Sequence, residues 1–108
     1  MNDHQELIST LAHCLSACEN CASACLDEDN VKKMVSCIRI NRDCADICGL
    51  SIKFLSRKSK NSNLVIGICA DICSECAEEC DKYEHDHCKK CAEACRKCAD
   101  SCKDYLNA

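Results

Sequence analysis

The sequence has no proline and only two glycines among its 108 residues. Helices tolerate these two residue types least, so their scarcity favours α-helix along the whole chain. Tryptophan is also absent, and the large aromatic residues are two tyrosines and one phenylalanine. Proteins that stack nucleic-acid bases or sugars on their side chains need more aromatic surface, which argues against that class of function.

The charge pattern argues against two kinds of partner. The net charge is −4, and acidic and basic residues are interspersed without a basic patch. Nucleic acid and anionic lipid would therefore meet no complementary surface. Residues 1–10 contain no apolar signal segment, and no later run is long enough to span a bilayer. We expect a single cytoplasmic domain over residues 1–108, with no nucleic-acid or membrane partner.

Cysteine, in contrast, occurs sixteen times. Most of these cysteines follow one another at alternating steps of three and four residues, which places them on one face of a helix. In a helical bundle that face is buried and normally carries leucine and isoleucine. The stripe predicts a core lined with sulfur, and the candidate metal ligands are Cys14, Cys18, Cys21, Cys25, Cys37, Cys44, Cys48, Cys69, Cys73, Cys76, Cys80, Cys88, Cys91, Cys95, Cys98 and Cys102.

The same periodicity predicts four helices separated by short polar turns. We expect them over residues 3–26, 30–56, from Ser62 or Asn63 to Cys80, and 88–106. Short connections make successive helices antiparallel. The predicted fold is all-α, an antiparallel up-down-up-down four-helix bundle with a cysteine-lined core.

This topology predicts two chemically different ends. Both termini and the loop at residues 57–61 lie at one end, where apolar side chains should form a plug: Leu7, Leu11, Ile52, Leu55, Leu64, Ile66, Tyr105 and Leu106. Met34, His85 and His87 lie at the other end, with Cys88 just inside. Thioether and imidazole groups bind soft metals, so these three residues are candidates for a metal uptake route.

Thiolates select Cu(I), zinc, cadmium or iron–sulfur clusters. No lysine or arginine occupies the stripe, so about four zinc sites of four thiolates each would bury a charge of roughly −8 without compensation. One Cu(I) per thiolate leaves no net charge, and the core could hold on the order of 16 Cu(I) ions. Zinc or cadmium sequestration and a disulfide-stapled structural protein remain as alternatives. The stripe lacks the glutamates of di-iron bundles and the loop spacing of iron–sulfur proteins, so we expect no enzyme activity.

Several motifs resemble those of the bacterial copper storage proteins. They are the CADIC strings at Cys44–Cys48 and Cys69–Cys73, the His85-Asp86-His87-Cys88 turn, and the cysteine-filled four-helix pattern itself. The resemblance spans essentially the whole chain and, without an export signal, points to the cytosolic branch of that family. It implies Cu(I) loading through core thiolates, uptake at the histidine end and self-association as a homo-tetramer. Delivery by a copper chaperone or a small thiol would fit this role.

Some residues have two interpretations. His85 and His87 are either solvated turn residues or part of the uptake route, and Met34 is either core packing or a thioether relay. Asn41 takes a stripe position where a thiol is expected, and we interpret it as a hydrogen-bonded core amide. His13 is offset from the stripe and is expected at the surface. Outside the stripe, a set of isoleucines predicts a self-association face, with thicker packing inside the monomer as the alternative: Ile38, Ile40, Ile47, Ile68 and Ile72. Gly49 and Gly67, on the second and third helices, are expected to permit close backbone approach.

Overall fold

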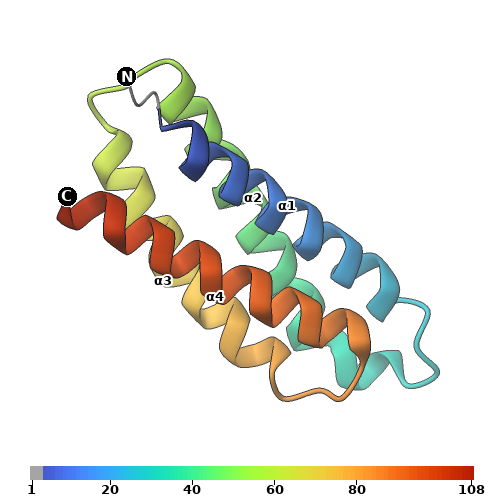
Figure 1. Ribbon diagram of the computed structural model, residues 1–108. Helices are drawn as coiled ribbons and strands as arrows, with labels where there is room; N and C mark the ends of the chain where they lie inside the picture. The colour runs from blue at the N-terminus through green and yellow to red at the C-terminus, as the bar shows by residue number, and fades with distance from the viewer. Residues whose placement is uncertain (1–3) are drawn as a thin grey trace.

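The structure, a computed structural model, describes residues 4–108, and within this range it contains four α-helices, one 3-10 helix and no strand. Proline is missing and glycine is rare, so little interrupts the helices. Figure 1 shows their order along the chain: α1 (Gln5–Cys25), η1 (Val31–Met34), α2 (Val35–Ser56), α3 (Ser62–Cys80) and α4 (Asp86–Asn107).

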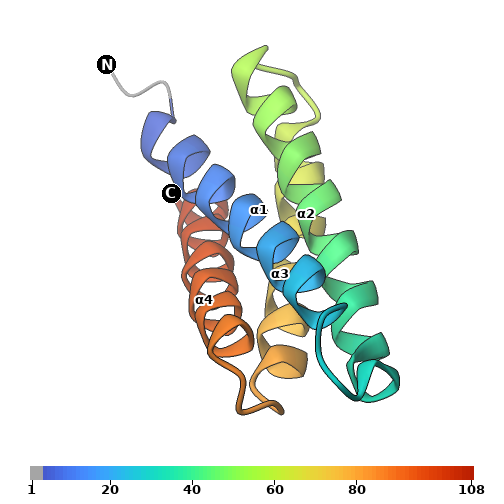
Figure 2. The ribbon, with the colours of Figure 1, turned by 90° about the vertical axis from the view of Figure 1, so that its right-hand side faces the viewer.

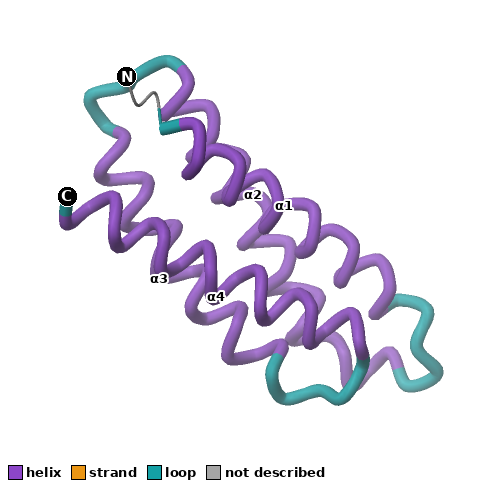
Figure 3. The backbone as a smooth tube through the Cα atoms, viewed as in Figure 1, coloured by secondary structure: helices purple, strands orange, loops and turns teal. Residues whose placement is uncertain are grey.

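The helices form the predicted antiparallel up-down-up-down bundle. Helix α1 packs against α2 and α4, and α3 packs against the same two helices, which closes a ring around one core. The molecule is a rod of 47 × 19 × 19 Å. Described loops are confined to the two ends of the rod (Figure 3), and the turns after α1 and α3 lie together at the end opposite the C-terminus (Figures 1 and 2). No helix in residues 4–108 is both long and apolar enough to cross a membrane.

Two helices begin at residues other than those predicted, and one predicted start cannot be compared. The predicted start at Asp3 lies outside the described residues. The second helix does not begin at Asn30, because a 3-10 turn over Val31–Met34 precedes α2. The amide of Lys33 donates to the Asn30 carbonyl at 3.1 Å, an i to i+3 bond that tightens this turn. Helix α4 begins two residues earlier than predicted, at Asp86, directly after an extended His85.

The apolar plug is confirmed for seven of its eight predicted members. Leu7, Leu11, Leu55 and Ile66 are buried, and the partly buried side chains of Ile52, Tyr105 and Leu106 pack against them and their neighbours. Leu64 is the exception, with 68% of its surface exposed. The buried face of α3 is set by its cysteines and by Val65 and Ile66, which leaves Leu64 on the opposite side.

The remaining apolar side chains mostly thicken the core. Ile40 is buried, and Ile38, Ile47 and Ile72 pack against the core from its edge, which leaves Ile68 as the exposed member of the predicted face. A Cβ at Gly49 would lie 3.4 Å from the side-chain atom Cδ1 of Leu15 and would meet no backbone atom, so this glycine does not mark a close backbone approach. The expectation for Gly67 is also wrong, because a Cβ there would meet nothing within 4 Å.

Candidate metal centre

All sixteen cysteines are fully buried, and all are free thiols. Each of the four helices contributes cysteines from its inward face, so the sulfurs occupy the axis of the bundle. The buried polar side chains of the described residues are Asn41, Ser51 and Ser62, and none of these carries a charge. The candidate centre is therefore a packed, sulfur-rich core without a buried charged side chain among the described residues.

Neighbouring sulfurs lie at distances suited to a shared metal ion. Cys18 Sγ is 3.5 Å from Cys95 Sγ, and Cys14 Sγ is 3.9 Å from Cys44 Sγ. A disulfide needs about 2.05 Å, which is much shorter. Two metal–sulfur bonds of about 2.3 Å that meet at about 100–120° span about 3.5–4.0 Å. Soft ions could enter between these sulfurs with little movement of the helices.

Groups of four sulfurs share members along the axis. Cys14, Cys18, Cys44 and Cys95 form one group in which every pair lies within 4.8 Å. A second group retains two of these sulfurs and adds two others, and is formed by Cys18, Cys76, Cys91 and Cys95. Because one sulfur belongs to more than one group, the core is an extended array in which thiolates can bridge ions.

The amide of Asn41 is built into this array, as the sequence predicts. Its Oδ1 accepts hydrogen bonds from the thiols of Cys76, Cys80 and Cys91 at 3.3, 3.4 and 3.3 Å. Its Nδ2 donates to Cys37 Sγ at 3.6 Å. The side chain thus satisfies its polar atoms with sulfur alone, which explains how an amide is tolerated at the centre of the bundle.

At the end formed by the two short turns, an imidazole joins the sulfurs. His87 Nδ1 lies 3.5 Å from Cys21 Sγ, 3.9 Å from Cys25 Sγ and 3.6 Å from Cys88 Sγ. These four residues form one of the groups close enough to hold a metal ion. His87 is 15% exposed, so this group lies between the core and the solvent.

The other predicted uptake residues lie at different depths. His85 stacks on His87 with a centroid distance of 5.3 Å, and its side chain is 40% exposed. Met34 is only 2% exposed and belongs to the core cluster, so it lies inside the bundle end. His13 is exposed on α1, as expected.

Burial shapes the acidity of the thiols near this end. Desolvation is the main cause that raises the pKa of Cys25, to about 11, and it also raises the pKa of Cys88. Hydrogen bonds from Cys21 and Cys80 lower the pKa of Cys37. Cys25 and Cys88 therefore remain mostly protonated at neutral pH, although metal binding requires thiolates. A metal ion must displace their protons.

Comparison with known proteins identifies the family. The family model described as copper storage protein matches residues 1–107. The chain belongs to the copper storage protein family. It is 42% identical over 85 residues to the uncharacterized cysteine-rich protein YhjQ of Bacillus subtilis (strain 168), a match that covers 79% of each chain.

Solved structures of copper storage proteins share the fold. The Cu(I)-bound copper storage protein BsCsp3 is 39% identical and matches with a TM-score of 0.91, covering 94% of this chain and 96% of that chain. A cytosolic copper storage protein from Streptomyces lividans, solved with five coppers, is 38% identical with a TM-score of 0.92, covering 94% of this chain and 90% of that chain. These relatives favour copper over the zinc, cadmium and disulfide alternatives.

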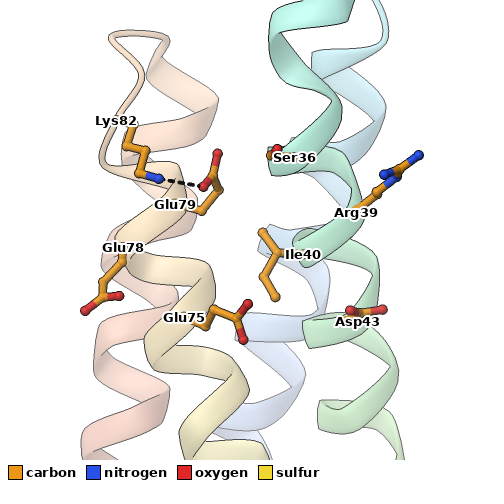
Figure 4. A pocket seen from close by; sticks show the side chains of 8 residues that line it. All are labelled: Ser36, Arg39, Ile40, Asp43, Glu75, Glu78, Glu79 and Lys82. Atoms are coloured by element: carbon orange, nitrogen blue, oxygen red, sulfur yellow. Dashed lines mark hydrogen bonds and ion pairs between the residues drawn. The ribbon is translucent and has the colours of Figure 1, made fainter.

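A surface groove between α2 and α3 has different chemistry from the copper storage core. Figure 4 shows its lining, which includes Arg39 and Asp43 on α2 and Glu75 and Glu79 on α3. The groove has a volume of about 460 Å³. Glu79 is already engaged, because Lys82 Nζ lies 3.0 Å from its Oε1 and the Tyr83 hydroxyl donates to its Oε2 at 2.8 Å. The groove contains no cysteine, and the candidate centre lies inside the bundle.

Sequence reasoning missed one residue at the histidine end. Glu28 lies in the turn after α1, and its Oε2 is 2.8 Å from His87 Nε2 and 3.5 Å from His85 Nδ1. From the sequence alone, Glu28 is only one residue of a short polar turn. The available signal was its position three residues after Cys25, within reach of the turn that carries both histidines.

Proposed function

We propose that this chain stores and buffers Cu(I) in its cysteine core. The observation that carries the proposal is the continuous array of sixteen buried thiols, with close sulfur pairs 3.5–4.0 Å apart. Thiolate is the ligand that Cu(I) prefers among those that proteins offer. The Cu(I)-bound and copper-loaded relatives support the same conclusion for this chain. All sixteen cysteines are proposed ligands.

Charge favours a monovalent ion. No lysine, arginine or histidine is among the buried side chains of the described residues, so excess thiolate inside the bundle has no cation to balance it. A Zn²⁺ ion held by four thiolates leaves a charge of −2, and burying several such sites would be costly. One Cu(I) per thiolate leaves the array neutral, so the core can fill without building up charge.

Loading exchanges protons for copper. Each thiol that enters the copper array gives up its proton, so roughly one proton is released per ion at neutral pH. The helices need not refold, because the thiols already pack as small apolar groups in the metal-free bundle. This mechanism suits reversible storage, and we propose no catalytic turnover.

Copper is proposed to enter at the histidine end. His85 is half-exposed, His87 faces both Glu28 and the sulfurs, and Met34 lies beneath the surface of the same end. At the opposite end, the described core is filled by apolar side chains such as Leu11, Leu55 and Ile66, which are not metal ligands. A copper chaperone or a small thiol is the proposed donor.

The setting of the protein is proposed from its family. We place it in the cytosol, as for the cytosolic relative from Streptomyces lividans, and expect one functional unit over residues 1–108 that assembles as a homo-tetramer. The exposed side chains of Leu64 and Ile68, one turn apart on α3, supply an apolar surface for this assembly.

Anaerobic titration of the reduced protein with Cu(I), followed by native mass spectrometry, tests the function. We expect saturation on the order of 16 Cu(I) per chain, set by one ion per thiolate. Saturation near four ions of zinc or cadmium, with Cu(I) reaching no higher count, would instead support divalent-metal sequestration.

Replacing both histidines tests the uptake route. We expect the His85→Ala, His87→Ala double variant to load more slowly while most of the cysteine capacity remains. His13→Ala is the matched control, because His13 is exposed on α1 and makes no described contact with sulfur. Unchanged loading rates in the double variant would rule out the histidine route.

A further inference from the structure

The two ring nitrogens of His87 face different groups. One faces a carboxylate and the other faces cysteine sulfurs. Its Nε2 lies 2.8 Å from Glu28 Oε2, while its Nδ1 faces the sulfurs of Cys21, Cys25 and Cys88 at 3.5, 3.9 and 3.6 Å. One imidazole therefore links a partly exposed carboxylate to the first sulfurs of the core. Glu28 comes from the turn after α1, and His87 from the first turn of α4.

The carboxylate determines which nitrogen carries the hydrogen. An ionised carboxylate only accepts hydrogen bonds, so a 2.8 Å contact requires the hydrogen on Nε2 of His87. In the neutral ring, Nδ1 then has a free lone pair, and this lone pair points at the three sulfurs. Without Glu28, the hydrogen could reside on Nδ1 and donate to the sulfurs, and no lone pair would be available to a metal there.

The second histidine limits movement of this arrangement. His85 lies parallel to His87, with an interplanar angle of 4°, and its Nδ1 is 3.5 Å from the same Glu28 oxygen. The two rings and the carboxylate thus form a compact unit at the mouth of the bundle. Glu28 itself is 28% exposed, which leaves it close to the protein surface but not freely solvated.

We propose that Glu28 is a positioning residue for copper uptake: its carboxylate holds His87 as the Nε2–H tautomer and thereby presents Nδ1 together with three thiols as a ready-made soft-metal site. This inference rests on the proposed Cu(I) storage function and adds a residue that does not itself touch the metal. Carboxylates that orient a metal-binding histidine in this way change metal affinity by about 10- to 100-fold when removed.

The test compares three variants of the full chain. Glu28→Ala removes the acceptor, Glu28→Gln keeps a neutral acceptor oxygen, and Glu84→Ala removes an exposed carboxylate from the same end of the bundle. Nitrogen-15 NMR of the reduced, metal-free proteins reports the tautomer of His87, with the signals assigned by comparison with His87→Ala. We expect the Nε2–H form in the wild type, Glu84→Ala and Glu28→Gln, and loss of this preference in Glu28→Ala.

Copper binding at the same nitrogen supplies the second readout. The His87 Nδ1 signal is followed while free Cu(I) is buffered with the chelator bicinchoninate. We expect half-occupancy in Glu28→Ala to need about 10- to 100-fold more free Cu(I) than in Glu84→Ala, with Glu28→Gln between them. Total copper capacity should stay close to that of the wild type, because the cysteines are untouched.

The outcomes separate the two proposals. An Nδ1–H tautomer in the wild type, or equal copper affinity in Glu28→Ala and Glu84→Ala, would overturn the role of Glu28 while leaving storage intact. Failure of the wild type to take up Cu(I) would refute storage, and the metal-free tautomer measurement would still decide whether Glu28 orients the ring.

Discussion

The thiol of Cys91 donates a hydrogen bond to the side-chain oxygen of Asn41 at 3.3 Å, deep in the core. The same oxygen accepts from Cys76 and Cys80 of α3, so one amide on α2 connects to both α3 and α4. An alanine or leucine at this position could pack but would accept no hydrogen bond. The amide therefore fixes the relative position of three helices at this level of the bundle.

Asn41→Ala should destabilise the metal-free protein by about 1–3 kcal/mol, because three thiols lose their acceptor and the core gains a small cavity. Anaerobic urea denaturation followed by circular dichroism measures the change. Asn63→Ala is the matched control, since Asn63 is exposed on α3 and a substitution there should change stability by no more than about 0.5 kcal/mol. Equal stability of the two variants would contradict a structural role for the amide.

The metal-free protein should lose stability in alkaline solution. Burial raises the pKa of Cys25 to about 11, whereas an unfolded cysteine titrates near about 8.5, so the folded state retains the proton longer. The resulting stabilisation is complete below about pH 8.5 and is lost as the pH rises through about 11. Thermal unfolding under argon across this range should show a falling midpoint.

Copper-loaded protein serves as the control for this pH series. Its thiolates are already deprotonated and coordinated, so they have no proton left to lose in the same range. A metal-free sample whose unfolding midpoint stayed constant from pH 8 to about 11 would show that the buried thiols do not control stability.

The two glycines should respond differently to alanine. At Gly67 a Cβ meets nothing within 4 Å, so Gly67→Ala should stabilise the protein by about 0.5–1 kcal/mol through helix propensity. At Gly49 the new methyl would lie 3.4 Å from Leu15 Cδ1, and part of the gain should be lost to that contact. Chemical denaturation of both variants measures the difference, and an equal or larger gain at Gly49 would show that the contact with Leu15 costs no stability.

A charge on the exposed face of α3 should break the proposed assembly. Leu64 and Ile68 are 68% and 46% exposed, and we expect the Leu64→Glu, Ile68→Glu double variant to be monomeric with its copper capacity retained. Leu26→Glu is the control, because Leu26 is equally apolar, is 62% exposed and directly follows α1, whereas Leu64 and Ile68 lie in the first turns of α3. Native mass spectrometry decides, and a double variant that remains tetrameric would place the interface elsewhere.

The cysteine stripe was sufficient to predict the bundle, its topology and its core. Alternating steps of three and four allow only one face to turn inward, and sixteen cysteines that follow this pattern left little ambiguity. Leu64 was misplaced because two neighbouring positions on α3, Leu64 and Val65, both lie near the edge of the stripe. Small shifts in helix rotation decide such positions, and packing against the other helices sets that rotation.

The turns were much less predictable. The 3-10 segment at Val31–Met34 and the contact between Glu28 and His87 depend on how two loops from distant parts of the chain meet at one end of the rod. Helical periodicity carries no information about such loop geometry. The sequence predicted that Asn41 is a hydrogen-bonded amide in the core. It could not predict the three thiols that donate to this amide, because their positions depend on the packing of separate helices.

Among the described residues, the apolar plug closes one end of the core and the imidazole pair lies at the other, which makes the histidine end the proposed entrance for copper. Ions that arrive first would be passed inward by those that follow, so the latest arrivals would stay nearest the exit. Copper would then be released in the reverse order of loading. A copper isotope added last would be the first to be released into solution. In such a protein, copper ions bound near the histidine end would exchange rapidly, and ions bound deeper in the cysteine core would exchange slowly.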